Sequence, residues 1–141
     1  MTSKNEKAVL ASYEAFNAHD LAGSVRPLSE DCAWTEHPTG TTYKGREEIK
    51  GWFAGFFAAF SDLKISDVKT FDPGEALIAT FVLTGTNDGP LGPLPATSRR
   101  ATIPVCDIFH VDDKGNVIAG ETYYDQLSLL IQLGHAQAPP A

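Results

Sequence analysis

The sequence predicts an α+β fold in which a curved antiparallel sheet wraps around N-terminal helices. Two observations predict it. Apolar residues recur at helical spacing over much of residues 5–60, and β-branched segments joined by turns fill most of the chain beyond Asp62. Because a curved sheet laid over helices forms a cone with one open end, we expect an internal pocket.

The first part of the chain combines helices with one short strand. In the first helix Val9, Tyr13 and Phe16 share one face, and Asp20 is the expected N-cap of the second. Pro38 ends the strand, because proline cannot donate to a sheet ladder. The predicted elements are a helix at 5–19, a helix at 21–28, a strand at 32–37, a loop at 39–45 and a helix at 45–60.

The third helix has the clearest pattern. Trp52, Phe56 and Phe60 are spaced four residues apart, so their side chains lie on one face of the helix. The plainest interpretation is a core helix packed on the sheet. Some of its aromatic rings would also line the pocket.

Strands dominate the rest of the single domain, which spans residues 1–141. The loop before the third of these strands contains Leu91 and Leu94, which are unusual in a purely solvated loop. Because this loop joins the two longest strands, we expect it near the mouth of the pocket. The predicted elements are strands at 64–71, 76–86, 99–111 and 117–124, turns at 72–75 and 112–116, a loop at 87–98, a helix at 126–133 and a loose tail at 135–141.

Composition narrows the possible partners. The 141 residues carry a net charge of −7, whereas nucleic-acid binding requires a basic face. The paired residues Arg99 and Arg100 make only a weak basic patch. The longest apolar-rich segment, residues 52–60, is far shorter than the roughly 20 residues that cross a membrane. We therefore expect a cytoplasmic protein that binds neither nucleic acid nor membrane.

The two cysteines, Cys32 and Cys106, lie far apart and show no metal-ligand spacing. We interpret both as free, buried thiols, and a catalytic cysteine is the less favoured alternative. The histidines and acidic residues show no ligand spacing either, so neither a metal nor a cofactor is predicted.

Asp107 stands out because it lies among apolar residues of a predicted strand. Alternation places it on one face with Ile103, Val105 and Phe109. A charged, unpaired carboxylate on a buried face costs several kcal/mol, so Asp107 must be paired, protonated or exposed on the outer face. Periodicity alone leaves both faces open.

Tyr13, His37 and Tyr124 are weaker candidates when each is taken alone. A tyrosine on an amphipathic helix is usually a core residue, and a lone histidine is more often packed or on the surface than catalytic. Tyr124 shares one face of the last long strand with Thr122, and Glu121 lies on the other face.

Four segments show a combined pattern, and they are Ala33–Pro38, Tyr43–Ile49, Cys106–Asp112 and Gly115–Ile118. Together they resemble the nuclear transport factor two-like superfamily, also called the cystatin-like α+β cone, over residues 5–134. This superfamily includes ketosteroid isomerase and the SnoaL-type polyketide cyclases. The loop at 87–100 and the ending at 126–134 look more like the cyclases.

The resemblance implies roles for four residues. As in ketosteroid isomerase, Tyr13 and a protonated Asp107 would donate hydrogen bonds to one carbonyl oxygen. His37 falls at the position of the base, with Glu36 beside it, and which of the two faces the pocket is left open. Tyr124 matches an aromatic residue that lines the pocket.

Two departures limit the resemblance. The polyketide cyclases have an acid/base Asp where this chain has Thr122, and a strand His where it has Asp107. Limonene epoxide hydrolase pairs an Arg with two Asp residues, and of these only Asp107 is kept, with Val105 and Thr122 in the other places.

We therefore predict an acid/base enzyme without a cofactor, an isomerase or cyclase acting through an enolate on a polyketide- or steroid-like carbonyl compound. The alternatives are a non-catalytic module that binds a small ligand or a partner and, less favoured, an epoxide hydrolase. The resemblance also implies a homodimer through the outer sheet face, which would bury Cys106, Ile108, Glu121 and Tyr123. The predicted pocket walls, besides Tyr124, are Phe16, Trp52, Phe56, Val82 and Val105.

Overall fold

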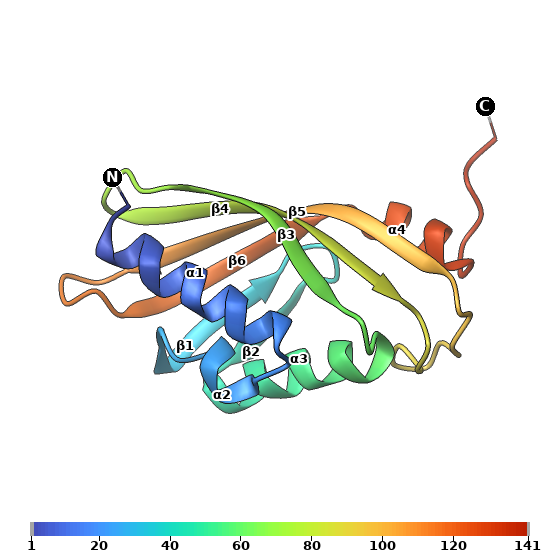
Figure 1. Ribbon diagram of the computed structural model, residues 1–141, viewed down its shortest axis with the longest axis horizontal. Coiled ribbons are helices and arrows are strands. Elements are labelled where there is room, and N and C mark those ends of the chain that lie inside the picture. The colour runs from blue at the N-terminus through green and yellow to red at the C-terminus, as the bar shows by residue number, and fades with distance from the viewer. Residues whose placement is uncertain (1, 141) are drawn as a thin grey trace.

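The structure, a computed structural model, describes residues 2–140 as helices packed on a curved sheet (Figure 1). The α+β fold predicted from the sequence is confirmed. The elements are α1 (Lys4–Asn17), α2 (Leu21–Ser24), β1 (Leu28–Glu36), β2 (Thr41–Lys44), α3 (Arg46–Ala59), β3 (Lys64–Phe71), β4 (Ala76–Thr86), β5 (Arg100–Val111), β6 (Val117–Tyr124) and α4 (Gln126–Leu133).

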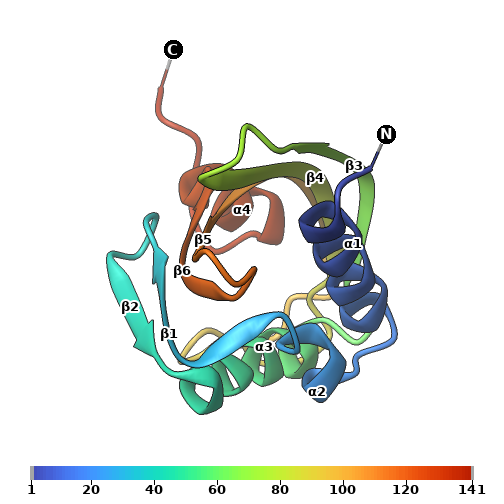
Figure 2. The ribbon, with the colours of Figure 1, turned by 90° about the vertical axis from the view of Figure 1, so that its left-hand side faces the viewer.

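The sheet has the strand order β2-β1-β6-β5-β4-β3. Its neighbouring strands are antiparallel except for β1 and β6, which run parallel. In Figure 2 the sheet curls around the side on which α1 and α3 lie. The parallel pair matters for the site, because it brings the end of β1 beside the end of β6.

Local sequence signals set the ends of the helices. The Ser3 hydroxyl accepts a hydrogen bond from the Glu6 backbone, and the Glu6 carboxylate accepts one from the Ser3 backbone, which completes a capping box. Asp20 caps α2, as predicted, and Asp125 caps α4. Gly134 ends α4 with a φ of 85°, a conformation that favours glycine.

The structure differs from the predicted elements where tertiary pairing overrides local pattern. The sequence pattern predicts residue 28 at the end of a helix, but in the structure strand β1 begins there. The reason is that the first residues of β1 pair, irregularly, with β6. Residues 41–44, expected in a loop, form β2 against β1. The backbone N–H groups of His135 and Ala136 both donate to the Leu130 carbonyl, and the looseness of the tail stays a prediction.

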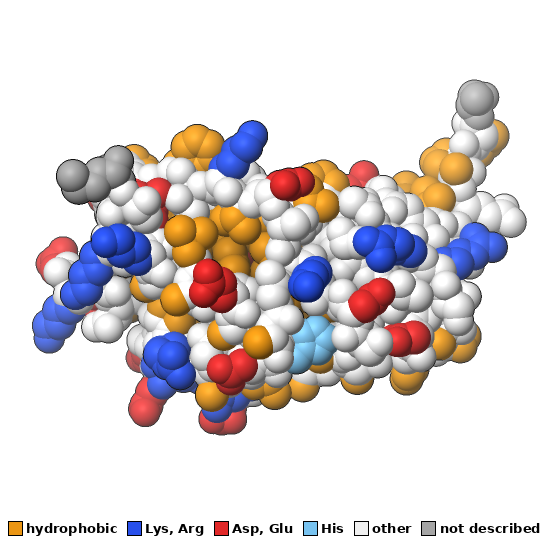
Figure 3. All heavy atoms as spheres, in the orientation of Figure 1, with side chains coloured by type: hydrophobic (Ala, Val, Ile, Leu, Met, Phe, Trp, Pro, Cys, Tyr) orange, Lys and Arg blue, Asp and Glu red, His pale blue; other side chains and the backbone are white. Residues whose placement is uncertain are grey.

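The interior is formed by the concave face of the sheet together with α1 and α3. Among residues 2–140, twenty-two buried hydrophobic residues make one continuous core, so the sheet and helices fold as one unit. On the face seen in Figure 3, basic side chains stand among acidic ones instead of forming a continuous basic surface. No helix within residues 2–140 is both long and apolar enough to span a bilayer.

Candidate functional site

An apolar cavity with a volume of about 100 Å³ lies inside the cone, between the helices and the concave face of the sheet. Most of its lining is aromatic or aliphatic. Among the described residues that line it, Asp107 alone carries a carboxyl group. The predicted wall residues Phe16, Trp52, Phe56, Val105 and Tyr124 all line it, together with Tyr13. Their placement agrees with the sequence analysis, and their roles stay predictions.

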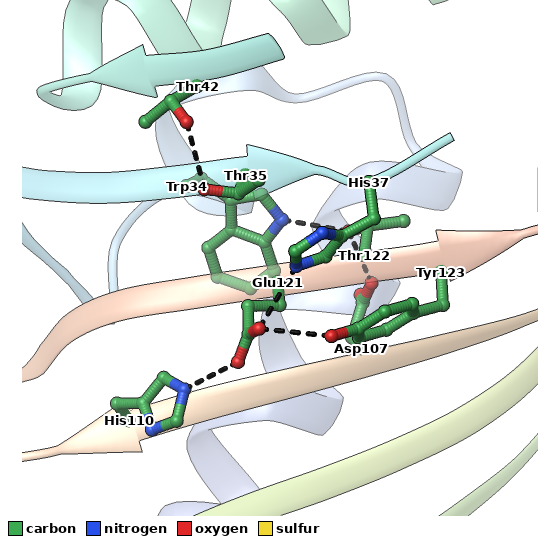
Figure 4. Close-up of polar contacts among 9 residues, drawn as sticks. All are labelled: Trp34, Thr35, His37, Thr42, Asp107, His110, Glu121, Thr122 and Tyr123. Carbon is green, nitrogen blue, oxygen red and sulfur yellow. Dashed lines mark hydrogen bonds and ion pairs between the residues drawn. The ribbon is translucent and has the colours of Figure 1, made fainter. Parts of the chain in front are cut away.

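Asp107 lies at the centre of a buried hydrogen-bond network. The Tyr13 hydroxyl donates to Asp107 Oδ2 at 2.8 Å, and the Thr122 hydroxyl donates to Oδ1 at 2.7 Å. The indole N–H of Trp34 in turn donates to the Thr122 hydroxyl at 2.8 Å (Figure 4). Asp107 is only 8% exposed, so three elements, α1, β1 and β6, fix one buried carboxyl on β5.

A glycine makes room for this network. Gly120 is paired with Trp34 across the parallel β1–β6 ladder. A Cβ atom at Gly120 would lie 2.1 Å from the Trp34 ring, which is far inside van der Waals contact. The missing side chain therefore lets the indole lie over β6, from where its N–H reaches Thr122.

Burial controls the ionisation of Asp107. Loss of solvent raises the pKa of its carboxyl from 3.8 to about 6, although the hydrogen bonds from Thr122 and Tyr13 lower it in part. Burial, and then the neighbouring Asp107 charge, raise the pKa of Tyr13 well above its ordinary value. Tyr13 is thus held as a hydrogen-bond donor, while Asp107 changes between its neutral and charged forms near pH 6.

A wider vestibule, with a volume of about 790 Å³, adjoins the cavity. The two spaces share four wall residues, which are Trp52, Phe56, Tyr124 and Leu129. The backbone N–H of Leu91 donates to the Leu94 carbonyl, and the backbone N–H of Leu94 donates to the Leu91 carbonyl, which closes a tight turn. Both residues line the vestibule. This agrees with the expectation that their loop lies near the mouth, and it explains why the loop carries two leucines.

Glu36 is buried in the wall of the vestibule, with only 3% of its surface exposed. Its Oε2 accepts a hydrogen bond from the Tyr124 hydroxyl at 2.8 Å, and its Oε1 accepts one from the Thr39 hydroxyl at 2.8 Å. The sequence leaves open whether Glu36 or His37 faces the pocket, and the structure places Glu36 inward. The signal was present in the alternation of β1, because Glu36 shares its inward face with Cys32 and Trp34.

The buried indole N–H of Trp52 has no hydrogen-bond partner among residues 2–140. Trp52 lines both the cavity and the vestibule, and its ring stacks on Tyr43 with centroids 4.8 Å apart. An unsatisfied buried donor is uncommon in a folded protein. Its position in the shared wall marks the place where a polar ligand atom would be stabilised.

The prediction that His37 lies in the pocket is wrong. Its ring lies on the outer face of the sheet, where Nε2 is 3.0 Å from Glu121 Oε1 and the ring stacks on Tyr123 (Figure 4). The reason is strand alternation, because Glu36 occupies the inward position and the next residue therefore points outward. The backbone N–H of His37 still donates to the Thr122 carbonyl.

The prediction that Val82 is a pocket wall is also wrong. Val82 lies on the outer side of β4, whereas Phe81 and Leu83 line the cavity. Because this strand is apolar on both faces, its sequence gives no alternation from which the inward set could be chosen.

The outer face of β5 and β6 carries a second polar cluster around Glu121. His110 Nε2 is 2.7 Å from Glu121 Oε2, on the opposite side of the carboxylate from His37. Hydrogen bonds from His110 and His37 lower the pKa of Glu121. Within residues 2–140, no group of three or more His, Cys, Asp or Glu side chains is arranged to hold a metal ion.

A six-stranded curved sheet that encloses an apolar pocket, with helices on its concave side, is the ketosteroid isomerase-like class of α+β fold. Within this class, a model of the SnoaL-like domain family matches residues 9–119. The match spans most of the chain, so the protein belongs to the SnoaL-like domain family. None of the proteins with curated functions matches it significantly.

Solved structures agree on the fold. AclR of Streptomyces galilaeus, provisionally assigned as a hydroxylase, has a TM-score of 0.83 at 19% identity, over 99% of this chain and 87% of its own. A provisionally assigned SnoaL-like polyketide cyclase of Jannaschia sp. CCS1 has 0.82 at 21% identity, over 96% and 93%. TerC, crystallised with polyporic acid, has 0.77 at 19% identity, over 94% and 99%. These identities establish the fold alone.

Proposed function

We propose that the protein is an acid/base enzyme, an isomerase or cyclase, that acts on a hydrophobic carbonyl compound through an enolate. The observation that supports this proposal is the buried Asp107 carboxyl group. It accepts hydrogen bonds from Tyr13 and Thr122, and it faces an apolar cavity. The substrate class is polyketide-like or steroid-like, because the walls are largely aromatic and aliphatic and would pack against flat rings.

The proposed chemistry follows from the ionisation of Asp107. In its neutral form, the carboxyl would donate a hydrogen bond to a carbonyl oxygen, and the Tyr13 hydroxyl would turn from Asp107 to the same oxygen. Two donors in a site without water stabilise the negative charge that develops on that oxygen. A bound apolar ligand would exclude water and raise the pKa of Asp107 further above 6, which favours the donating form.

One enolate serves two reactions. Loss of a proton from the carbon beside the carbonyl, and its return to another carbon, is an isomerisation. Attack of the enolate carbon on a second carbonyl group is an aldol cyclisation. The polyketide cyclase assignment of the Jannaschia neighbour and the polyporic acid crystallised with TerC support a substrate of this kind.

The binding of a nitrated naphthol that is ionised throughout pH 5–8 tests the proposal, because a phenolate resembles an enolate. Quenching of Trp34 and Trp52 fluorescence would report binding. We expect the affinity to fall as Asp107 ionises near pH 6, and Asp107→Asn to remove this pH dependence. Asp107→Leu should weaken binding about tenfold or more, because it removes a charge-assisted hydrogen bond.

Glu121→Gln is the matched control, because Glu121 lies on the same strand pair but on the opposite face. It should leave binding unchanged. If the wild-type affinity is insensitive to pH and to both Asp107 substitutions, the enolate mechanism is contradicted.

A non-catalytic ligand-binding module is the second candidate, and one observation favours it. The hydroxyls of Tyr13 and Thr122 and the indole N–H of Trp34 are already satisfied within the protein. A site of this kind would bind an apolar ligand without using its polar groups. Naphthol binding that ignores Asp107 would support this function.

We also propose a homodimer that forms through the outer face of the sheet. Tyr123 is 42% exposed on this face, next to the partly exposed Cys106 and Ile108. Light scattering on the wild type and on Tyr123→Lys tests the proposal, because a charged residue in the interface should shift the protein to a monomer.

We also propose a cytoplasmic location, which fits the two free thiols of Cys32 and Cys106.

A further inference from the structure

The wall of the vestibule combines carboxyl groups with aromatic rings. We propose that the vestibule binds an organic ammonium group, so that the ligand of this protein is a ring compound that carries a positively charged alkylated nitrogen. The ring would occupy the inner cavity, and the nitrogen would lie beside Glu36 in the vestibule. The inference goes beyond the proposed chemistry, because it concerns the charge of the ligand and holds for an enzyme and for a non-catalytic binding module alike.

The charges that line the two spaces have one sign. Asp107 lines the cavity, and Glu36 and Glu48 line the vestibule. Within the described part of the chain, no Lys, Arg or His side chain lines either space. A cleft that is lined by charge of one sign and walled by apolar groups concentrates its electric field. The two spaces would therefore attract a cation and repel a ligand that carries a carboxylate.

Glu36 is the buried carboxyl group of the vestibule, and the protein supplies it with no positive partner. Only 3% of its surface is exposed. Its two oxygens accept hydrogen bonds from the neutral hydroxyls of Tyr124 and Thr39, and among residues 2–140 it forms no ion pair. Buried acidic residues are usually paired, because an unpaired charge is costly to remove from water. Since each oxygen can accept a further hydrogen bond, an ammonium ligand would supply the missing partner.

Aromatic side chains surround this carboxyl group. Tyr43, Trp52, Phe56 and Tyr124 line the vestibule together with Glu36. Alkyl groups on a ligand nitrogen would gain apolar contacts with these rings, and a cation that lies over the face of an aromatic ring is attracted to it. Burial, and then the nearby Glu36, raise the pKa of Tyr43 to about 12. The Tyr43 ring therefore stays neutral, and the negative charge of the wall is confined to its carboxyl groups.

The sizes of the two spaces divide such a ligand into two parts. The inner cavity is about 100 Å³, and a cavity of about 150 Å³ in another protein binds benzene. The cavity consequently holds one ring at most, and any substituent extends into the vestibule of about 790 Å³. Glu36 pairs with Thr122, which pairs with Asp107, so the backbones at the two carboxyl groups are roughly 10 Å apart. A short alkyl link would carry the nitrogen from a ring beside Asp107 to Glu36.

Three ligands that share a phenyl ring and a short side chain test the inference, because they differ in charge. They are phenethyltrimethylammonium, 4-phenylbutan-2-one and 3-phenylpropionate, which are cationic, neutral and anionic. Calorimetry in about 0.15 M salt, which screens distant surface charges, gives the affinities. We expect the wild type to bind the cation about tenfold or more tightly than the ketone, since a contact with a charged group is stronger than a neutral one, and the anion most weakly.

The position of the bound cation is measured separately. Nitrogen-15 NMR follows the indole N–H of Trp52, which lies in the wall shared by the cavity and the vestibule. The signal is assigned by its absence in Trp52→Phe. Binding in the vestibule should shift this signal, and tight binding that leaves it unmoved would place the cation elsewhere and overturn the inference.

Substitution of Glu36 tests its role. Glu36→Gln keeps the shape of the side chain and should weaken binding of the cation about tenfold, while the affinity for the neutral ketone stays near that of the wild type and shows that the variant is folded. Glu36→Asp retains the charge and should keep most of the preference for the cation. Glu47→Gln is the matched control, because Glu47 lies on the same helix as Glu48, has a side chain that is 88% exposed and lines neither space. It should leave all three affinities unchanged.

The inference is overturned if the wild type binds the ketone as tightly as the cation, a comparison that needs no variant. It is also overturned if Glu47→Gln weakens binding of the cation as much as Glu36→Gln does, because the net charge of −7 would then attract cations without a site. Tetramethylammonium that binds as tightly as the phenethyl compound would contradict the placement of ring and nitrogen in one ligand. Failure of the proposed function has a different signature, because naphthol binding then ignores Asp107 while the preference for the cation remains.

Discussion

Asp107 and Glu121 are acidic residues on neighbouring rungs of the same strand pair, and the structure gives them opposite properties. Asp107 pairs with Thr122 on the concave face, and Glu121 pairs with Ile108 on the outer face. Burial raises the pKa of Asp107 to about 6, whereas hydrogen bonds from His110 and His37 lower that of Glu121.

The difference shows that access to water affects the pKa of these carboxyl groups more than their hydrogen-bond partners do. Both carboxyl groups accept more than one hydrogen bond, so hydrogen bonding alone would lower both pKa values. For Asp107 the cost of removing a charge from water outweighs that effect. The concave face therefore provides a carboxyl group that takes up a proton near pH 6, and the outer face provides a fixed anion.

The largest predicted effect is on the concave face at Gly120. Gly120→Ala would place a Cβ atom 2.1 Å from the Trp34 ring, so the indole or the strand must move. We expect a loss of about 3 kcal/mol or more in the free energy of unfolding, measured by urea denaturation. Gly55→Ala is the control, because a Cβ there meets nothing within 4 Å, and a helical Ala should stabilise by up to about 1 kcal/mol. Equal effects of the two substitutions would contradict the close packing around Trp34.

Asp107→Asn should change how stability depends on pH. Because the folded pKa of Asp107 is raised from 3.8 to about 6, its favourable contribution is complete below pH 3.8 and is lost as the pH rises through 6. The wild type should therefore lose roughly 3 kcal/mol relative to Asp107→Asn between pH 3.5 and pH 8. Denaturation at a series of pH values measures this. A difference that does not vary with pH would mean that burial does not perturb this carboxyl.

Tyr13→Phe should have a smaller effect on stability and a clear effect on titration. It removes the hydrogen bond to Asp107, which is worth about 1.5–3 kcal/mol when the acceptor is charged. Because that hydrogen bond lowers the pKa of Asp107, its loss should raise the pKa above 6. The midpoint of the pH dependence of naphthol binding should then move to higher pH, and a midpoint that moves lower would argue against the contact.

Glu121→Gln should have the smallest effect, within about 1 kcal/mol, because the carboxylate and its histidine partners are partly exposed. The folded pKa of Glu121 lies below its ordinary value of 4.5, so its contribution is present above pH 4.5 and is lost as the pH falls through the lower value. The stabilities of wild type and variant should therefore converge in acid. A loss comparable to that of Gly120→Ala would show that the outer cluster is a major determinant of stability.

The sequence predicted the parts of the site that regular alternation specifies. The alternation of β5 sets Asp107 on one face with Val105 and Phe109, and helical spacing sets Tyr13 on the apolar face of α1. The family resemblance wrongly puts His37 in the pocket, whereas the alternation of Trp34 and Glu36 favours the outer face. Local pattern cannot show the parallel pairing of β1 with β6, which sets Glu36 beside Thr122.

The titration of the Asp107 carboxyl carbon shows directly whether burial raises the pKa of this group. Carbon-13 NMR of the wild type, with the signal assigned by its absence in Asp107→Asn, gives the pKa without any ligand or substrate. We expect a midpoint near 6. A midpoint at or below 3.8, the ordinary value for an aspartic acid, would show that Asp107 is a fixed anion like Glu121, and the site would then lack its neutral hydrogen-bond donor.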